Sequence, residues 1–299
     1  MSGAVTVETV RAGCDENHGH DHAGAITSPE AFCGHLRLAA ACDARGRTYL
    51  ASQSFRAPFH LSKPYWDGAV LQVQVVNSTA GILEGDRLDA DVTVGRGASL
   101  LVTTPSAARA FMMRGRGASC TQGFRVQEDG WLEYAPEPLI PHRDAEYRQA
   151  TRLAVAEGGS AAFFDALTPG RVGRGECWAW RRLRLSLEVH YADEPVLREC
   201  LDADGPTVAA AAAFYGTPEA CIGTLVLITP RLAAHDPVWD AVRALHARER
   251  WVGASALRRG GWIVRMIAAN GQILRDTVRD LRALFAPALP RLASDLRKL

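Results

Sequence analysis

The chain has 299 residues, 47% of them hydrophobic and 22% charged, so it can bury a self-sufficient core. Lys and Arg total 34 against 33 Asp and Glu, which gives a net charge of +1. This balance excludes a global field that would attract nucleic acid or an anionic membrane. Uncharged stretches such as 205–218 are too short for a transmembrane helix. We therefore expect a globular protein with neither nucleic acid nor membrane as a partner.

Seven cysteines are scattered along the chain without a CxxC pair, which is neither a disulfide framework nor a zinc ribbon. No apolar segment near the start resembles a secretory signal. The sequence thus predicts a cytoplasmic protein with reduced thiols.

Residues 1–30 are predicted to be a disordered tail, because Gly, Ala, Ser and charged residues dominate without sustained periodicity. The tail contains His18, His20 and His22. Imidazoles suit nickel, so one hypothesis is that the three capture this ion; the alternative is a solvated tail with incidental histidines. Residues 31–299 are predicted to form a single β-rich domain.

From residue 35 to about 191, apolar and polar residues alternate, as in strands with one buried face. The alternation is clearest at 183–191 and recurs at 71–75 and 88–94. Asp129-Gly130 and similar turn residues favour tight hairpins. From many short strands and short turns we expect a mainly β fold of stacked, mostly antiparallel sheets.

The last third of the chain combines strands and helices. Residues 225–229 are predicted to form a buried strand, and 251–257 and 262–267 a hairpin. Helices are predicted at about 236–247, which Asp-Pro begins, and at about 270–286, where apolar residues repeat at helical spacing.

The chain lacks the GxGxxG, GxxxxGK[ST], GxSxG and HExxH motifs, so nucleotide binding and common hydrolase chemistry have no support. Three carboxylates stand in unusual surroundings. Asp86 ends a turn just before a predicted strand, and capping its own turn is its simplest role. Glu133 lies among large apolar residues.

Glu176 is followed by Trp178 and Trp180, which share its face if the segment is a strand. A carboxylate among indoles is costly unless it is hydrogen-bonded, paired, hydrated or holding a cation. Two interpretations stay open, a bound cation and an ion pair to a nearby arginine; the candidate arginines are Arg171, Arg174 and Arg182.

Several motifs resemble, in order and spacing, those of the UreD/UreH family of urease accessory proteins, over roughly residues 35–270. They are Gly81…Gly85-Asp86, Thr103-Thr104, Leu132-Glu133…Pro136…Pro138…Ile140-Pro141, Gln149, Gly170-Arg171…Gly175-Glu176 and Val252-Gly253-Ala254-Ser255…Val264-Arg265. The resemblance implies stacked sheets with a β-helix-like course and a small C-terminal helical part. It implies no catalysis by this chain.

The resemblance also implies partners. Members bind apo-urease and recruit a helical accessory protein of the UreF type and a GTPase of the UreG type. The resemblance is also compatible with a homodimer of this chain within the complex. They hold no firmly bound cofactor; nickel passes transiently, and a water-filled channel is one route for it. On this basis we place Asp86, Glu133 and Glu176 along such a channel, because oxygen ligands release a divalent ion more readily than thiolates do.

Two rivals differ in class. The first is a β-helical carbohydrate-active hydrolase or lyase that uses Asp86, Glu133 or Glu176 as acid and base, which predicts carboxylates on an open, aromatic-lined groove. The second is a nickel store relying on the histidine tail alone, which leaves the β-rich body unexplained.

Deleting residues 1–30 tests the tail hypothesis. If the three histidines capture nickel, the deletion lowers the nickel stoichiometry measured by equilibrium dialysis. Unchanged stoichiometry would remove the hypothesis.

Overall fold

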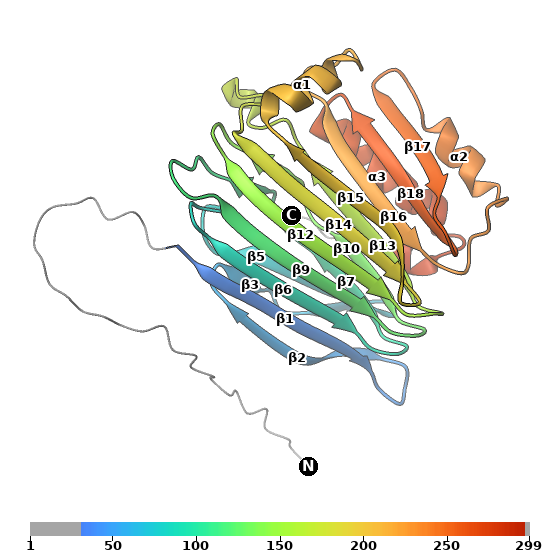
Figure 1. Ribbon diagram of the computed structural model, residues 1–299. Helices are drawn as coiled ribbons and strands as arrows, with labels where there is room; N and C mark the ends of the chain where they lie inside the picture. Colours follow the sequence, from blue (N-terminus) through green and yellow to red (C-terminus); the bar gives the residue numbers. More distant parts are fainter. Residues whose placement is uncertain (1–30, 297–299) are drawn as a thin grey trace, which may run out of the picture. The chain divides into compact units, whose positions relative to one another are not determined.

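The computed structural model describes residues 31–296, so the predicted tail with His18, His20 and His22 lies outside the described residues. The alternating segments form two facing sheets (Figure 1). The seven-stranded sheet has the order β15-β14-β12-β9-β6-β1-β2. Its strands are β1 (Cys33–Cys42), β2 (Thr48–Arg56), β6 (Arg87–Val94), β9 (Ala118–Val126), β12 (Glu146–Val155), β14 (Arg182–Tyr191) and β15 (Glu194–Ala203).

The eleven-stranded sheet has the main order β17-β18-β16-β13-β10-β7-β5-β3, with β4, β8 and β11 attached beside it. Its strands are β3 (Phe59–Leu61), β4 (Tyr65–Asp67), β5 (Val70–Asn77), β7 (Ser99–Thr103), β8 (Ala108–Ala110), β10 (Trp131–Ala135), β11 (Leu139–Pro141), β13 (Ser160–Leu167), β16 (Cys221–Ile228), β17 (Arg250–Ala256) and β18 (Gly261–Ala268).

The chain coils from one sheet to the other. β6 is followed by β7 of the facing sheet, β9 by β10, and β12 by β13. Because every coil runs in the same direction, β1, β6, β9, β12 and β14 pair in parallel, and so do β5, β7, β10 and β13. The mainly β fold and its β-helix-like course are confirmed. The expectation of mostly antiparallel pairing is wrong for these central strands, although the flanking pairs β1–β2, β14–β15 and β13–β16 are antiparallel.

The turns explain this difference, because turn residues expected to close hairpins instead carry the chain between the sheets. Successive turns stack: the Trp131 amide donates to the Ala98 carbonyl at 2.8 Å, and the Ser160 amide to the Gly130 carbonyl at 2.9 Å. A Cβ at Gly130 or Gly159 would lie 2.8 Å from the Gln127 carbonyl oxygen, so only glycine fits this stacking.

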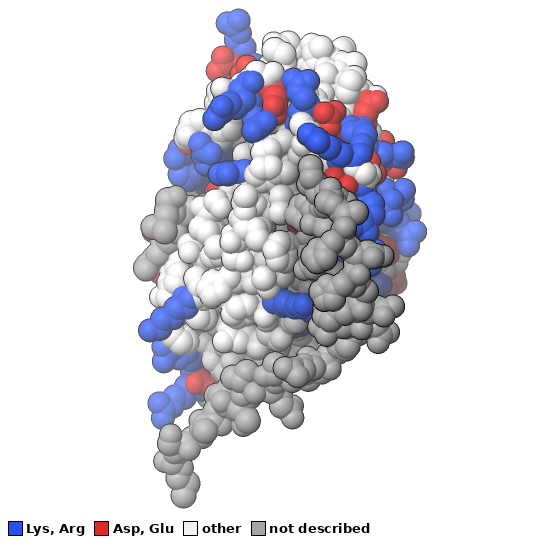
Figure 2. Space-filling view, turned by 90° about the vertical axis from the view of Figure 1, so that its left-hand side faces the viewer, with Lys and Arg blue, Asp and Glu red and all other residues white. Residues whose placement is uncertain are grey.

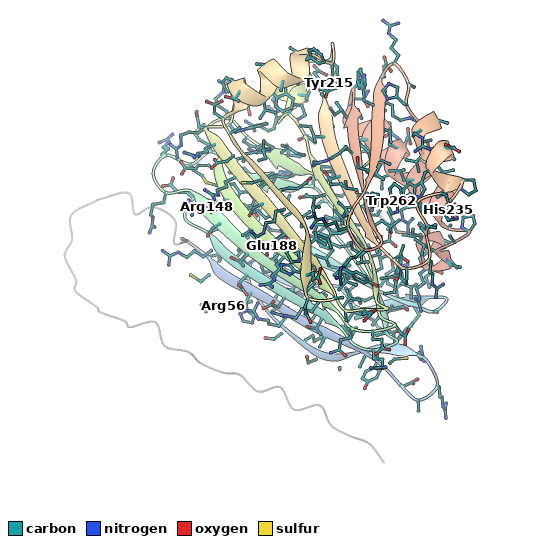
Figure 3. The ribbon with its side chains drawn as sticks, turned by 45° about the vertical axis from the view of Figure 1, so that its right-hand side comes forward. Arg56, Arg148, Glu188, Tyr215, His235 and Trp262 are labelled. Atoms are coloured by element: carbon teal, nitrogen blue, oxygen red, sulfur yellow. The ribbon has the colours of Figure 1, made fainter. Side chains whose placement is uncertain are left out.

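Helices cover the outer face of the eleven-stranded sheet (Figure 1). They include α2 (Val238–Ala244) and α3 (Gly271–Phe285). Both predicted helices are therefore confirmed, and the first is shorter than expected. The Ala-rich segment forms a third helix, α1 (Gly205–Ala213), and short 3-10 turns span Val172–Arg174 and Pro290–Ala293. The indole of Trp262 on β18 stacks on Trp239 of α2 with 3.6 Å between ring centroids (Figure 3). The predicted strand at 225–229 and the predicted 251–267 hairpin are confirmed as β16 and β17–β18. Within residues 31–296, no helix combines the length and the apolar character that crossing a membrane requires.

Candidate functional site

A band of polar side chains crosses the space between the two sheets. On one side of it lies an apolar cluster at the starts of β6 and β14, with Leu88 and Leu183. On the other side lies a second apolar cluster, with Val94 and Val126 at the ends of β6 and β9. Buried polar groups are costly unless they form hydrogen bonds, so each polar group of this band needs a partner in the protein or a water molecule.

A cavity of about 270 Å³ opens within the band. Strands β9 and β12 of one sheet and β10 and β13 of the other contribute Cys120, Gln122, Tyr147, Gln149, Tyr134 and Asp165 to its lining. Two further charged residues, Arg109 of β8 and Glu137 after β10, also line the cavity. A water molecule occupies about 30 Å³ in the liquid, so a polar cavity of this size has room for several.

Side chains of neighbouring strands form a hydrogen-bonded row along this cavity. The Tyr147 hydroxyl donates to Gln149 Oε1 at 3.1 Å, Gln149 Nε2 lies 3.5 Å from Thr151 Oγ1, and the Thr151 hydroxyl donates to Gln122 Oε1 at 3.2 Å. The row offers oxygen atoms to water or a cation without carrying charge itself.

Asp165 on β13 faces this row from the opposite sheet. Desolvation raises the pKa of its carboxyl from 3.8 to about 6, against which the Ala166 amide, donating to Oδ1 at 2.9 Å, acts only partly. The residue lies deep between the sheets and is nevertheless only half-buried, because the cavity gives it accessible surface. At neutral pH a carboxyl group with this pKa is mostly ionised, and the cavity beside it has room for water.

Three other titratable groups of this cavity, Cys120, Tyr134 and Tyr147, stay neutral. Burial raises the pKa of the Cys120 thiol to about 12 and holds the pKa of the Tyr147 phenol well above its usual range. Burial also raises the pKa of the Tyr134 phenol. At physiological pH these three groups are therefore hydrogen-bonding partners without charge.

The cavity opens where β5, β7 and β10 end. Thr79, Ala80, Ser106 and Ala107 from the loops after β5 and β7 belong to its lining. Figure 2 looks onto this side of the molecule and shows a broad area with few charged side chains, with basic and acidic side chains at its borders. The mouth thus lies in a surface that other proteins can approach without desolvating many charges.

The three predicted carboxylates are not among the residues that line this cavity. Asp86 is fully buried in the turn before β6, where its carboxylate accepts the Leu83 amide at 2.8 Å and the Phe32 amide at 3.0 Å. The turn-capping interpretation is confirmed. Gly85 precedes it with φ +78°, a conformation that favours glycine.

Glu133 is fully buried on the helix-facing side of β10, away from the cavity. The Arg282 guanidinium of α3 donates to both carboxylate oxygens, at 2.6 Å and 3.2 Å, and also to the Ser294 carbonyl at 2.7 Å. This bidentate pair joins the helical layer to the sheet.

Glu176 confirms the ion-pair interpretation. Arg171 donates to both its oxygens, at 2.8 Å and 2.5 Å, and this hydrogen-bonded pairing lowers the pKa of Glu176 to about 2. Gly170 has φ +130°, and a Cβ atom at this position would lie only 2.6 Å from the Glu176 carbonyl oxygen. Gly175 ends the 3-10 turn in the left-handed conformation. The motif Gly170-Arg171…Gly175-Glu176 is thus a closed loop.

The segment with Glu176, Trp178 and Trp180 is a loop rather than a strand, and Trp178 has φ +55°, so the condition under which the three would share a face is not met. Both indoles are buried and contact each other edge to face. These residues therefore do not form the open, aromatic-lined groove that the carbohydrate-active alternative requires.

The Pro-rich segment after β10 forms part of the cavity wall through Pro136. The two threonines of the motif hold it: the Thr103 hydroxyl donates to the Ala135 carbonyl at 2.6 Å, and the Glu137 amide donates to Thr104 Oγ1 at 2.8 Å. The Pro138 carbonyl accepts the Ala108 amide at 3.1 Å. The prolines limit the number of amides that need partners here.

Within residues 31–296, no three His, Cys, Asp or Glu side chains are grouped to hold a metal ion. Asp165 is the cavity residue that the sequence interpretation missed. Its signal is a single charge at the end of the apolar run Ala161-Ala162-Phe163-Phe164, since a buried charge in a strand needs water or a partner.

Replacing Glu133 by Ala leaves the Arg282 charge buried without its carboxylate, so we expect a loss of about 3–5 kcal/mol in the free energy of unfolding, measured in urea. The double variant Glu133→Leu/Arg282→Met should recover most of it. Asp240→Ala breaks an exposed pair with Arg243 and is the control, with an expected cost of about 0–1 kcal/mol. A loss no larger than that of the control would show that the buried pair does not join the layers.

Replacing Asp165 by Asn should stabilise the protein at pH 7.5. The folded-state pKa of about 6 lies above the unfolded value of 3.8, so ionisation disfavours the folded state at high pH. The gain is at most about 3 kcal/mol, less whatever hydration the cavity supplies, and it shrinks as the pH falls through 6 toward 4. Urea unfolding across this pH range measures it; a gain independent of pH would contradict the assignment.

Comparison with known proteins gives the family. A family model described as UreD urease accessory protein matches residues 33–298. A urease accessory protein UreD from Opitutus terrae is 49% identical over 271 residues, covering 90% of this chain and 99% of its own length. Proteins of the same name from Cupriavidus pinatubonensis and Cupriavidus metallidurans are 31% and 34% identical, covering 88% and 75% of this chain and 89% and 79% of their own lengths. By that family name the chain is an accessory protein rather than a catalytic subunit. The chain belongs to the UreD family of urease accessory proteins, and its role lies in urease maturation.

Proposed function

We propose that the chain is a scaffold that binds apo-urease, recruits a helical accessory protein of the UreF type and a GTPase of the UreG type, and conducts nickel through the cavity between its sheets. The observation that carries the proposal is a carboxyl group, Asp165, that lines a cavity with room for water between the two sheets. A protein whose only task is docking has no need for such a costly group.

The lining suits an ion that must be released again. The carboxylates of Asp165 and Glu137 and the neutral oxygens of Gln122 and Gln149 are hard ligands that bind a divalent ion more weakly than thiolates do. Cys120 is kept as a thiol by its raised pKa of about 12, so it does not trap the ion as a thiolate ligand.

The proposed GTPase partner supplies a chemistry for which this sequence has no motif. The sequence has no phosphate-binding loop, so GTP hydrolysis belongs to a partner. The weakly charged surface around the cavity mouth is the place where we expect a partner to dock and continue the passage (Figure 2). Nickel is the cargo in this proposal, and the histidines of the tail are a first capture point for it.

This placement moves the passage away from Asp86, Glu133 and Glu176. Each of these has backbone or arginine partners that account for its charge, so we assign them to the framework and Asp165 to the passage.

The test is urease activation reconstituted from purified components with the variant Asp165→Leu, which removes the charge and makes the cavity apolar. Complex formation should be unchanged, because the mouth is untouched. Activation should fall by about tenfold or more, the factor that corresponds to about 1.4 kcal/mol of lost cation binding.

The matched control is Asp240→Asn, whose side chain on α2 is 81% exposed; it should activate normally. A second variant, Ala108→Trp, narrows the mouth without changing a charge and should also lower activation. Full activation by Asp165→Leu would contradict conduction through this cavity and leave only the scaffold role.

A further inference from the structure

Strand register places a second set of polar residues in line with Asp165. In the eleven-stranded sheet, Asp165 of β13 pairs with Thr224 of β16, and Thr224 pairs with Arg265 of β18. Since paired residues of neighbouring strands point to the same face, these three form a row that runs from the interior to the side of the molecule.

The facing sheet carries a matching row. Thr151 of β12 pairs with Gln122 of β9 and with Leu187 of β14, and Leu187 pairs with Glu199 of β15. This row also begins at the cavity and ends at the edge of its sheet, because β15 is the last strand.

A second cavity, of about 440 Å³, lies between the outer ends of the two rows. Asp165, Thr224, Arg265 and Glu199 all belong to its lining, and Asp165 lines the first cavity as well. The two cavities therefore share Asp165 as a lining residue.

An ion pair closes the outer ends of the rows. Arg265 of β18 donates to the Glu199 carboxylate of β15, so the pair spans the gap between the sheets. The Arg265 side chain is 56% exposed, whereas that of Glu199 is 19% exposed. The arginine thus sits on the solvent side with freedom to swing outward, and the glutamate points inward.

We propose that the Arg265–Glu199 pair is a gate on a side opening of the passage, through which a divalent cation is exchanged with Asp165. The inference rests on the proposed function. With the pair closed, the guanidinium neutralises Glu199 and repels a cation at the opening. When Arg265 swings out, Glu199 becomes a free carboxylate at the rim of the second cavity, and the cation has an oxygen ligand at Glu199 and another at Asp165.

The alternative role of the pair is to brace the two sheets. A brace affects only stability, whereas a gate also controls cation binding. Nickel binding to the full-length chain separates the two, in a background where His18, His20 and His22 are replaced by Gln so that the tail does not mask the signal.

We expect Arg265→Gln to bind Ni²⁺ about tenfold more tightly by isothermal titration, because one positive charge is removed beside two carboxylates. Combining it with Asp165→Asn should cancel the gain. Glu199→Gln, which frees Arg265 to approach Asp165, should weaken binding; it supplies an independent test in case Arg265→Gln does not fold. Arg198→Gln is the matched control, because Arg198 also borders this cavity but pairs with Glu188 on the outer face and is 74% exposed.

Unchanged nickel affinity in Arg265→Gln, with only a lower free energy of unfolding, would establish a brace and overturn the gate. An equal gain in Arg198→Gln would show a general charge effect and also overturn it. The passage itself fails separately, if Asp165→Leu activates urease normally.

Discussion

The structure depends on the register between parallel coils. Hydrogen bonds between neighbouring strands fix which residue lies beside which, and in a parallel coil the same face recurs at each turn of the chain. A polar residue in one coil is therefore placed beside a polar residue in the next, as Gln122 is beside Thr151. Single polar positions, each expensive in an apolar strand, become a continuous track because the register aligns them.

The carboxylates of the family motif secure the framework around that track. Asp86 binds the amides of a turn, Glu176 closes a loop with Arg171, and Glu133 ties α3 to the sheet through Arg282. All three meet donors that satisfy their charge, so they are fixed in place. Asp165 differs, because it accepts a hydrogen bond from the Ala166 amide but has, among the described residues, no arginine beside it in an ion pair. Its pKa is therefore raised by burial, and it also lines the cavity.

Charge in this interior is balanced in two ways. On the helix side of the eleven-stranded sheet, Glu133 and Arg282 form a buried ion pair, and removing either residue leaves the charge of the other buried without a partner. Between the sheets, Asp165 has water-accessible space, and Arg265 and Glu199 pair at the rim, where one partner reaches solvent. A buried pair gives rigidity, and a pair at the rim can open at little cost in desolvation.

Local features of the chain were readable from the sequence. Period-two alternation located β6 and β14, Asp236-Pro237 located the start of α2, the apolar stripe located α3, and the ordered motifs indicated the family. These depend on neighbours within a few residues, which the sequence displays directly. Whether Asp129-Gly130 closes a hairpin or crosses to the facing sheet is decided by packing between distant strands, and so is parallel pairing. The same holds for Asp165, Glu199 and Arg265. Their alignment exists only once the coils are stacked, because the register between strands joins residues that lie far apart in the chain.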